Sequence, residues 1–209
     1  MQIIQKYIVE SKSVLFEGDG YSEEWAKEAE KRGLPNVKTT PLALDAYVTD
    51  KVKHLFESNE IYNHPELEAR HEIMLEAYIK KVQIEARVMG DLATTFILPS
   101  AIKYQNVLIK NILGLKEAGL AETAYANQKQ VLEAISNHIN IVSDNVEKMI
   151  EARKKANELT DTREMAIAYC DEVKGKYFDV IRYNVDKLEL LVDDAFWLLP
   201  KYREILFLR

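Results

Sequence analysis

One proline in the middle of a long helical pattern constrains this fold more than any other feature of the sequence. The pattern opens at Pro65, where proline suits the first helical turn because its missing N–H would lack an intrahelical partner anyway, and it runs to about Gly119. Pro99 removes one backbone hydrogen bond and crowds the preceding turn. Because the apolar spacing resumes after Pro99, we predict a kink there rather than a helix end. Such a helix spans roughly 80 Å at about 1.5 Å per residue, which requires an extended bundle.

The apolar residues of this helix recur at spacings of four and three, which places them in one stripe. Before the proline the predicted stripe consists of Leu75, Ile79, Val82, Ala86, Met89, Ala93 and Phe96. After the proline it continues with Ile102, Ile109 and Ile112. The stripe predicts that this helix packs against partner helices along most of its length.

Two further helices are predicted downstream. The first runs from about Glu122 to Glu158, with a stripe made of Leu132, Ile135, Ile139, Val142, Val146 and Met149. The next starts after Asp161, which has a glutamate three residues later as in a capping box. Its stripe contains Ala166, Cys170, Val173, Tyr177, Val180, Asn184, Leu188, Leu191, Ala195 and Leu198. Short connections predict an all-α fold, a long antiparallel three-helix bundle with a kinked helix, over residues 63–209.

Asn184 is the polar member of the last stripe. It either holds the register of the bundle by pairing with a polar neighbour or lies at the bundle rim. The rim is the commoner place for a polar residue, and we expect Asn184 there.

Residues 1–62 are predicted to form an irregular segment with short helices that packs on the bundle. A helix over residues 2–13 has an apolar face formed by Ile3, Ile4, Tyr7 and Ile8. Ser22 is expected to cap a second helix that ends at Gly33, and Pro41 to open the next.

Composition narrows the classes of protein. The 209 residues are 47% hydrophobic, so they are able to bury a substantial core. A net charge of −6 with both signs interspersed favours neither nucleic acid nor an anionic membrane as a partner. No stretch reaches about 18 uncharged apolar residues, which argues against a membrane span. Cys170 is the single cysteine, so no intrachain disulfide forms and a reducing, cytoplasmic location is expected.

No catalytic motif is found. The sequence has no GxxxxGK[ST] phosphate loop, and the turn at residues 18–20 lacks the third glycine of a dinucleotide fingerprint. Cys170 falls in an apolar stripe, which favours a small buried hydrophobe over a nucleophile. We therefore assign no catalytic, cofactor-binding or metal-binding residue to this chain.

One pair of residues has metal-ligand spacing. Glu68 and His71 match the Glu-x-x-His spacing of di-iron helical bundles, which need a second such pair. His138 has no glutamate three residues before it, and His54 and His64 lie in the irregular segment. We expect an exposed or rim histidine rather than a metal site.

The last helix and the C-terminus are unusually apolar. Its aromatic residues are Tyr169, Tyr177, Phe178, Tyr183, Phe196 and Trp197. Aromatic core packing explains such a cluster better than a ligand pocket. The apolar stretches at residues 196–200 and 205–208 predict an end docked on its own bundle or on another chain.

Several separated segments, in the right order, resemble the region downstream of the catalytic barrel in type III glutamine synthetases. The matching segments are Gly20–Trp25, Glu28–Pro41, Ala69–Glu76, Ile84–Ala86, Ile97–Pro99 with Ala101 and Tyr104, Asp186–Glu189, Val192, Trp197, Leu199–Glu204 and Leu206–Phe207. Leu198 stands where the family usually has proline, which affects only a local turn. The resemblance covers nearly the whole chain.

The resemblance implies a parent enzyme that joins glutamate and ammonia with ATP and a divalent metal, magnesium or manganese, through a γ-glutamyl phosphate. The family's metal-binding glutamates and nucleotide contacts lie on a β-barrel that has no match here, so no catalytic residue is carried over. The implied role is structural: contact with the catalytic domain of the same subunit and with neighbouring subunits of a homo-oligomer. Met1 is then expected to be an added or displaced start.

Two other functions stay open. One is a stand-alone helical bundle with a metal or ligand at Glu68, His71 and Glu72 or at the aromatic cluster, which predicts a stoichiometric bound metal or small molecule. The other is a free-standing protein that binds a partner helix along its apolar stripes, which predicts self-association or partner capture without glutamine formation.

Overall fold

The computed structural model of the chain describes residues 2–207, and within that range it contains helices and no strand. The chain divides between residues 38 and 39 into two compact units. The elements of the first unit are α1 (Gln2–Glu10), η1 (Lys12–Val14) and α2 (Glu23–Lys31). The sequence placed the boundary at residues 62 and 63, whereas here the helices between 39 and 62 belong to the same unit as the bundle.

The second unit is the long-helix bundle with its flanking short helices. Its elements are α3 (Thr40–Leu44), η2 (Asp45–Val48), α4 (Asp50–Ser58), α5 (His64–Leu92), η3 (Ala93–Ile97), α6 (Leu98–Glu117), η4 (Glu122–Ala124), α7 (Ala126–Ala156), α8 (Thr162–Ala168), η5 (Tyr169–Phe178), α9 (Asp179–Leu191) and α10 (Tyr202–Ile205). Both η3 and η5 are π-helical, so their neighbouring α-helices join into continuous arms.

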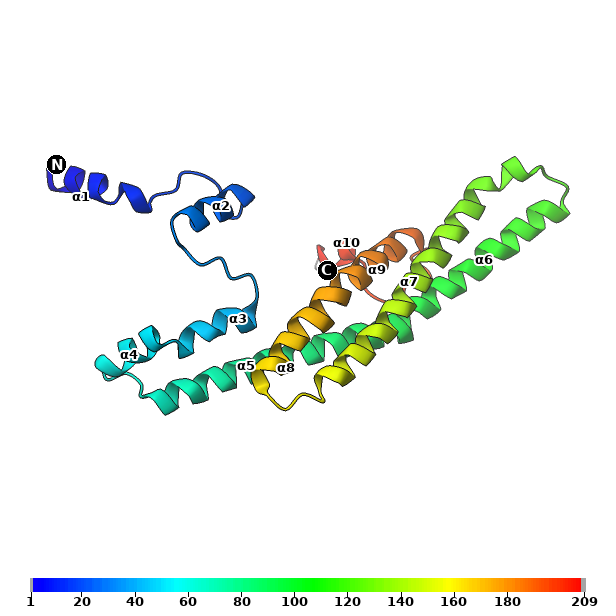
Figure 1. Cartoon of the computed structure of the whole chain (residues 1–209). Helices are drawn as coiled ribbons and strands as arrows, with labels where there is room; N and C mark the ends of the chain where they lie inside the picture. The colour runs from blue at the N-terminus through cyan, green and yellow to red at the C-terminus, as the bar shows by residue number, and fades with distance from the viewer. Residues whose placement is uncertain (1, 208–209) are drawn as a thin grey trace. The chain divides into compact units, whose positions relative to one another are not determined.

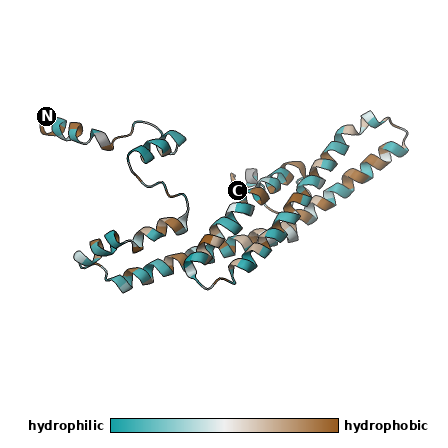
Figure 2. Cartoon of the chain, viewed as in Figure 1, coloured by the Kyte–Doolittle hydropathy of each residue, from teal (hydrophilic) through white to brown (hydrophobic). Residues whose placement is uncertain are grey.

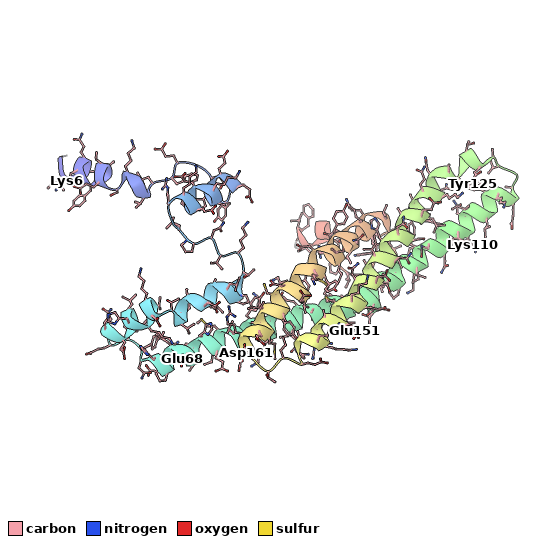
Figure 3. The ribbon with its side chains drawn as sticks, viewed as in Figure 1. Lys6, Glu68, Lys110, Tyr125, Glu151 and Asp161 are labelled. Atoms are coloured by element: carbon pink, nitrogen blue, oxygen red, sulfur yellow. The ribbon has the colours of Figure 1, made fainter. Side chains whose placement is uncertain are left out.

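Three arms run up, down and up, as predicted. The first arm is α5–η3–α6, α7 lies antiparallel to it, and α8–η5–α9 returns along both (Figure 1). The core between the arms includes Leu75, Val82, Ala86, Ala93, Ile135, Val142, Val146, Met149, Ala166, Tyr169, Val173 and Leu188. The predicted all-α class and antiparallel bundle are therefore confirmed. Near their connection, α6 and α7 extend beyond the third arm as a two-helix hairpin, where Figure 3 labels Lys110 and Tyr125.

The first arm begins where the sequence predicts. Asn63 accepts a hydrogen bond from the Glu66 backbone N–H at 2.9 Å, and the Glu66 carboxylate accepts one from the Asn63 N–H at 2.9 Å. This reciprocal capping box satisfies two N–H groups that the helix itself leaves unpaired. Pro65 occupies the first turn.

The first arm continues past Pro99, as predicted, but its irregularity precedes the proline. Over Ala93–Ile97 the hydrogen bonds skip five residues, as in the bond from the Leu98 N–H to the Ala93 carbonyl. A π turn inserts one residue into the helix and rotates everything after it. The predicted core residue Phe96 is therefore exposed, and Ile97 is buried in its place.

The same rotation overturns the predicted stripe of α6. Ile102 and Ile109 are exposed, and Ile112 is only half-buried. Ala101 is buried instead, and Tyr104 and Leu108 pack against the core from one helical face. Of the three residues predicted for this stripe, Ile102 and Ile109 thus lie on the outer face of α6, and Ile112 does not.

The third arm shows a corresponding shift. Asp161 caps α8, with its carboxylate accepting from the Glu164 N–H at 2.7 Å, as predicted. The ten-residue π segment η5 then changes the register, so that Val180 is exposed while Ile181 is buried. The predicted stripe was wrong at Val180 for this reason.

The third arm is also shorter than predicted. It ends at Leu191, because Val192 adopts an extended backbone. Beyond that point Ala195 and Leu198 are exposed, contrary to the predicted stripe. The Lys201 ammonium donates to the carbonyls of Glu189 at 2.7 Å and Val192 at 2.9 Å, which satisfies helix-end acceptors that lack an intrahelical donor.

Asn184 is buried rather than at the rim. Its side-chain oxygen lies 2.8 Å from Nδ1 of His138 on α7, and its amide donates to the Val180 carbonyl at 2.8 Å. A buried amide needs such partners, since an unpaired polar group inside a core is costly. The register-holding pair that the sequence left as the second possibility is the observed one.

Candidate functional site

The residues with metal-ligand spacing are held by other partners. The Glu68 carboxylate accepts from the Lys53 ammonium at 2.8 Å. Nε2 of His71 lies 3.7 Å from the carboxylate of Asp45, and this nitrogen is buried without a hydrogen bond. Glu72 accepts from the hydroxyl of Thr162 at 3.4 Å. Among the described residues, no group of three or more His, Cys, Asp or Glu side chains is placed to hold a metal ion.

Asp45 links three helical elements at this end of the bundle. Its carboxylate, on η2, accepts two hydrogen bonds from the Arg163 guanidinium on α8, at 2.8 and 2.7 Å. The paired guanidinium holds the pKa of Asp45 below its usual range, with a smaller contribution from His71 on α5. The arrangement is that of a fork-shaped ion pair joining η2 to the bundle rather than of a catalytic acid.

Five of the six aromatic residues that were predicted for the last helix belong to the bundle core or pack against it, and Tyr183 does not. Tyr169 is fully buried, whereas Tyr183 is exposed beside Lys187. Phe196 packs against Tyr104 of α6, with ring centroids 6.0 Å apart. The expected core packing applies to Tyr169, Phe178 and Trp197, which are buried, while Tyr177 and Phe196 pack against the core from its edge.

The buried Tyr169 is the centre of a polar network that reaches the surface of the bundle. Its hydroxyl donates to the Asn157 side-chain oxygen at 2.7 Å and accepts from the Gln83 amide at 3.0 Å. The three residues come from η5, the end of α7 and α5. Like the His138–Asn184 pair, this network favours one relative register of the arms, because sliding one arm would leave the hydroxyl of the buried Tyr169 without these partners.

Cys170 is half-buried. Burial raises the pKa of its thiol, which keeps the thiolate scarce at neutral pH. Burial likewise raises the pKa of the nearby Tyr78 hydroxyl. These environments fit the predicted role of Cys170 as a packing residue.

One hollow of the bundle is an apolar groove of about 700 Å³. It lies between α5, α9 and the segment that follows α9. Its lining includes Ile84, Val88, Ile181, Val185, Trp197 and Leu199. The C-terminal segment is thus docked on its own bundle through Trp197 and Lys201, while Ile205 and the two residues after it are exposed. Leu208 lies outside the described residues.

A second apolar surface runs along one face of α6. Ile102, Ile109 and Leu113 are exposed and share one helical face, since their spacings of seven and four return to the same side. Figure 2 shows the apolar colouring along this helix. We call Ile102, Ile109 and Leu113 the α6 stripe, and Lys103 and Lys110 lie beside it. The sequence predicted that Ile102 and Ile109 would be core residues.

A third apolar surface lies in the first unit, on α1. Its predicted face is present, and all of its large apolar side chains are exposed. No helix among the described residues is both long and apolar enough to cross a membrane. The described residues therefore form a helical domain whose main surface features are apolar faces.

Comparison with known proteins identifies the family to which this chain is similar. A family model described as the glutamine synthetase C-terminal domain matches residues 1–116. A glutamine synthetase of Bacteroides fragilis is 42% identical over 210 residues, which cover 99% of this chain and 28% of that protein. The type-3 glutamine synthetase of Dictyostelium discoideum is 30% identical, over 100% of this chain and 29% of its own length. A glutamine synthetase of Butyrivibrio fibrisolvens is 31% identical, over 99% and 29%.

The matched residues make up more than half of the chain, so the chain belongs to the glutamine synthetase C-terminal domain family. The resemblance seen in the sequence is confirmed. The chain spans less than a third of the length of these relatives.

The sequence did not identify His138 as the partner of Asn184, and it gave no sign of the group formed by Gln83, Tyr169 and Asn157. Each interaction joins residues more than ten positions apart, and Gln83 lies 86 positions from Tyr169. A polar residue inside an apolar stripe was the available signal at Asn184. No comparable signal marked Gln83, which the helical spacing placed outside the stripe.

Proposed function

We propose that this chain is the non-catalytic C-terminal domain of a type III glutamine synthetase. The parent enzyme forms glutamine from glutamate and ammonia and converts ATP to ADP and phosphate, with magnesium or manganese as the divalent metal. ATP and the metal belong to the catalytic barrel, and this chain supplies no ligand to either. The parent enzyme works in the cytoplasm.

The observation that carries this proposal is the family match over residues 1–116, combined with the small share of each relative that the chain spans. A domain that makes up under a third of an enzyme leaves room for a separate catalytic part. Side chains that could act as acids or bases support a non-catalytic role for this domain. Asp45, Glu68 and Tyr169 are all engaged in ion pairs or hydrogen bonds within the chain.

The role of the domain is to contact the catalytic part of its own subunit and to help join neighbouring subunits of a homo-oligomer. Exposed apolar faces on a stable bundle mark surfaces that a partner covers, since monomeric proteins rarely leave such faces in water. The α6 stripe suits a subunit contact because it lies on an extended hairpin. Its border of Lys103 and Lys110 fits a partner surface that carries carboxylates.

The test uses the complete synthetase polypeptide that contains these residues. Ile109→Glu combined with Leu113→Glu places two charges on the α6 stripe and is expected to lower the assembled fraction in sedimentation at least about tenfold. Val107→Glu is the matched control, because Val107 is also exposed but lies on another face of α6. It is expected to leave assembly and glutamine formation unchanged.

Two results would contradict the proposal. Glutamine formation by the 209-residue chain alone would show that the domain is catalytic. Normal assembly of the Ile109→Glu/Leu113→Glu enzyme would show that the α6 stripe does not form a contact between subunits.

A further inference from the structure

Helix α1 exposes a complete apolar face. Ile3, Ile4, Tyr7 and Ile8 follow helical spacing on one side, and each is more than half exposed. On the polar side, Lys6 and Glu10 pair at 3.8 Å, so the helix itself is built for an interface between water and an apolar surface. A nine-residue helix is marginal in water without packing.

The rest of the first unit does not cover this face. Its small apolar cluster joins Phe16 to Trp25, with ring centroids 4.6 Å apart, and Ser22 caps α2 next to it. Ala29 is the one buried residue among those of this unit whose side chains the structure describes. A segment of fewer than about 40 residues rarely folds on so small a core, so the first unit needs a partner surface.

The family match identifies which partner fits. The family model includes the whole first unit, so α1 is part of the shared domain rather than an appendage. The relatives contain more than twice as much polypeptide outside the matched region as inside it. In a complete synthetase of this kind, the chain that precedes residue 1 is joined directly to α1.

We infer that the α1 face packs on the polypeptide that precedes residue 1 in the complete synthetase, and that this contact anchors the helical domain to the catalytic part. The inference rests on the proposed function. A direct covalent connection gives an effective concentration in the millimolar range, so even a small apolar contact is occupied without help from a second subunit. The charges of Lys6 and Glu10 cancel, so α1 has no net charge. It therefore has no electrostatic preference for an oppositely charged partner on another molecule.

Hydrogen exchange measured by mass spectrometry tests this contact. Amides of α1 are compared between the 209-residue chain and the complete polypeptide, and exchange is expected to be slower in the complete polypeptide by about tenfold or more. Ile4→Lys combined with Ile8→Lys is expected to abolish that slowing. Val9→Lys is the matched control, because Val9 is equally exposed, at 67%, but lies on the opposite side of α1. It is expected to keep the slowing.

Three results would overturn the inference. Equal exchange of α1 in both forms would show that no preceding segment covers it. Slow exchange of α1 already in the 209-residue chain would show that residues of this chain, rather than the preceding polypeptide, cover the α1 face. Slow exchange that disappears when the complete enzyme dissociates into single subunits would assign the contact to a neighbouring subunit.

Failure of the inference is separable from failure of the proposed function. If the complete polypeptide forms glutamine while α1 exchanges freely, only the inference is wrong. If the natural polypeptide has no catalytic part before residue 1, the proposed function is wrong, and the inference with it.

Discussion

The bundle core and helix α1 carry similar apolar residues at helical spacing, yet one set is buried and the other is exposed. Leu188 on α9 is fully buried between the arms, while Ile4 on α1 is 64% exposed. Their sequence patterns alone do not separate them. Periodicity therefore identifies the apolar face of a helix but not the partner that covers it.

Truncating one residue from each set in the 209-residue chain tests whether the two sets differ in burial. Leu188→Ala leaves a cavity in the core and is expected to lower the free energy of unfolding by about 2–5 kcal/mol. Ile4→Ala is expected to change it by no more than about 0.5 kcal/mol, because no partner is lost. Urea denaturation followed by circular dichroism measures both. Similar losses for the two variants would contradict the difference in burial.

A second comparison tests the register set by the π turn η3. Ile97→Ala is expected to cost about 2–4 kcal/mol of unfolding free energy, because Ile97 is 6% exposed. Phe96→Ala is expected to cost under about 1 kcal/mol, since Phe96 is 38% exposed. The same denaturation experiment measures both. The reverse order would mean that the helix keeps an unbroken α register up to Pro99.

The buried pair His138 and Asn184 gives a smaller expected effect. Asn184→Ala is expected to destabilise the chain by about 1–3 kcal/mol, because it leaves the His138 ring without its buried partner. Replacing both residues with leucine is expected to restore much of the loss. A double-mutant cycle made of His138→Leu, Asn184→Leu and the variant that carries both measures the coupling. If the changes in unfolding free energy of the two single variants add up to that of the double variant, the two residues do not interact.

The smallest expected effect is at Asp45. Its pKa is lower in the folded chain than its ordinary value of 3.8, so its ion pair with Arg163 stabilises the fold above that value. The stabilisation is lost as the pH falls through the lower folded pKa. Asp45→Asn is therefore expected to cost up to about 1 kcal/mol at pH 7 and almost nothing near pH 2, given the partial exposure of both groups. Denaturation at both pH values is the measurement. A cost that does not vary with pH would contradict a charge effect.

The sequence was sufficient to predict the helices and their order but not their rotation. The cap at Asp161, the start near Pro65 and the buried stripe of α7 follow from local chemistry and regular spacing. At Phe96 and Val180 the predicted burial was wrong, because each residue lies after or within a π segment that changes the register. Regular spacing does not account for an inserted residue, so it assigns residues within or just after the insertion, such as Phe96 and Val180, to the wrong face.

The candidate surfaces were harder to predict than the core. The α6 stripe was expected to be buried because apolar residues usually are, and the sequence shows only that Ile102 and Ile109 are apolar. The end of the third arm depends on Lys201 reaching back to carbonyls of Glu189 and Val192. Such contacts join residues that are distant along the chain, and spacing rules describe only near neighbours.

The most direct test of the central claim is the length and content of the natural reading frame upstream of residue 1. We expect that the frame continues for several hundred residues and encodes a β-barrel with metal-binding glutamates. A natural frame that starts at Met1, with no catalytic part before it, would contradict the assignment of this bundle to a complete synthetase.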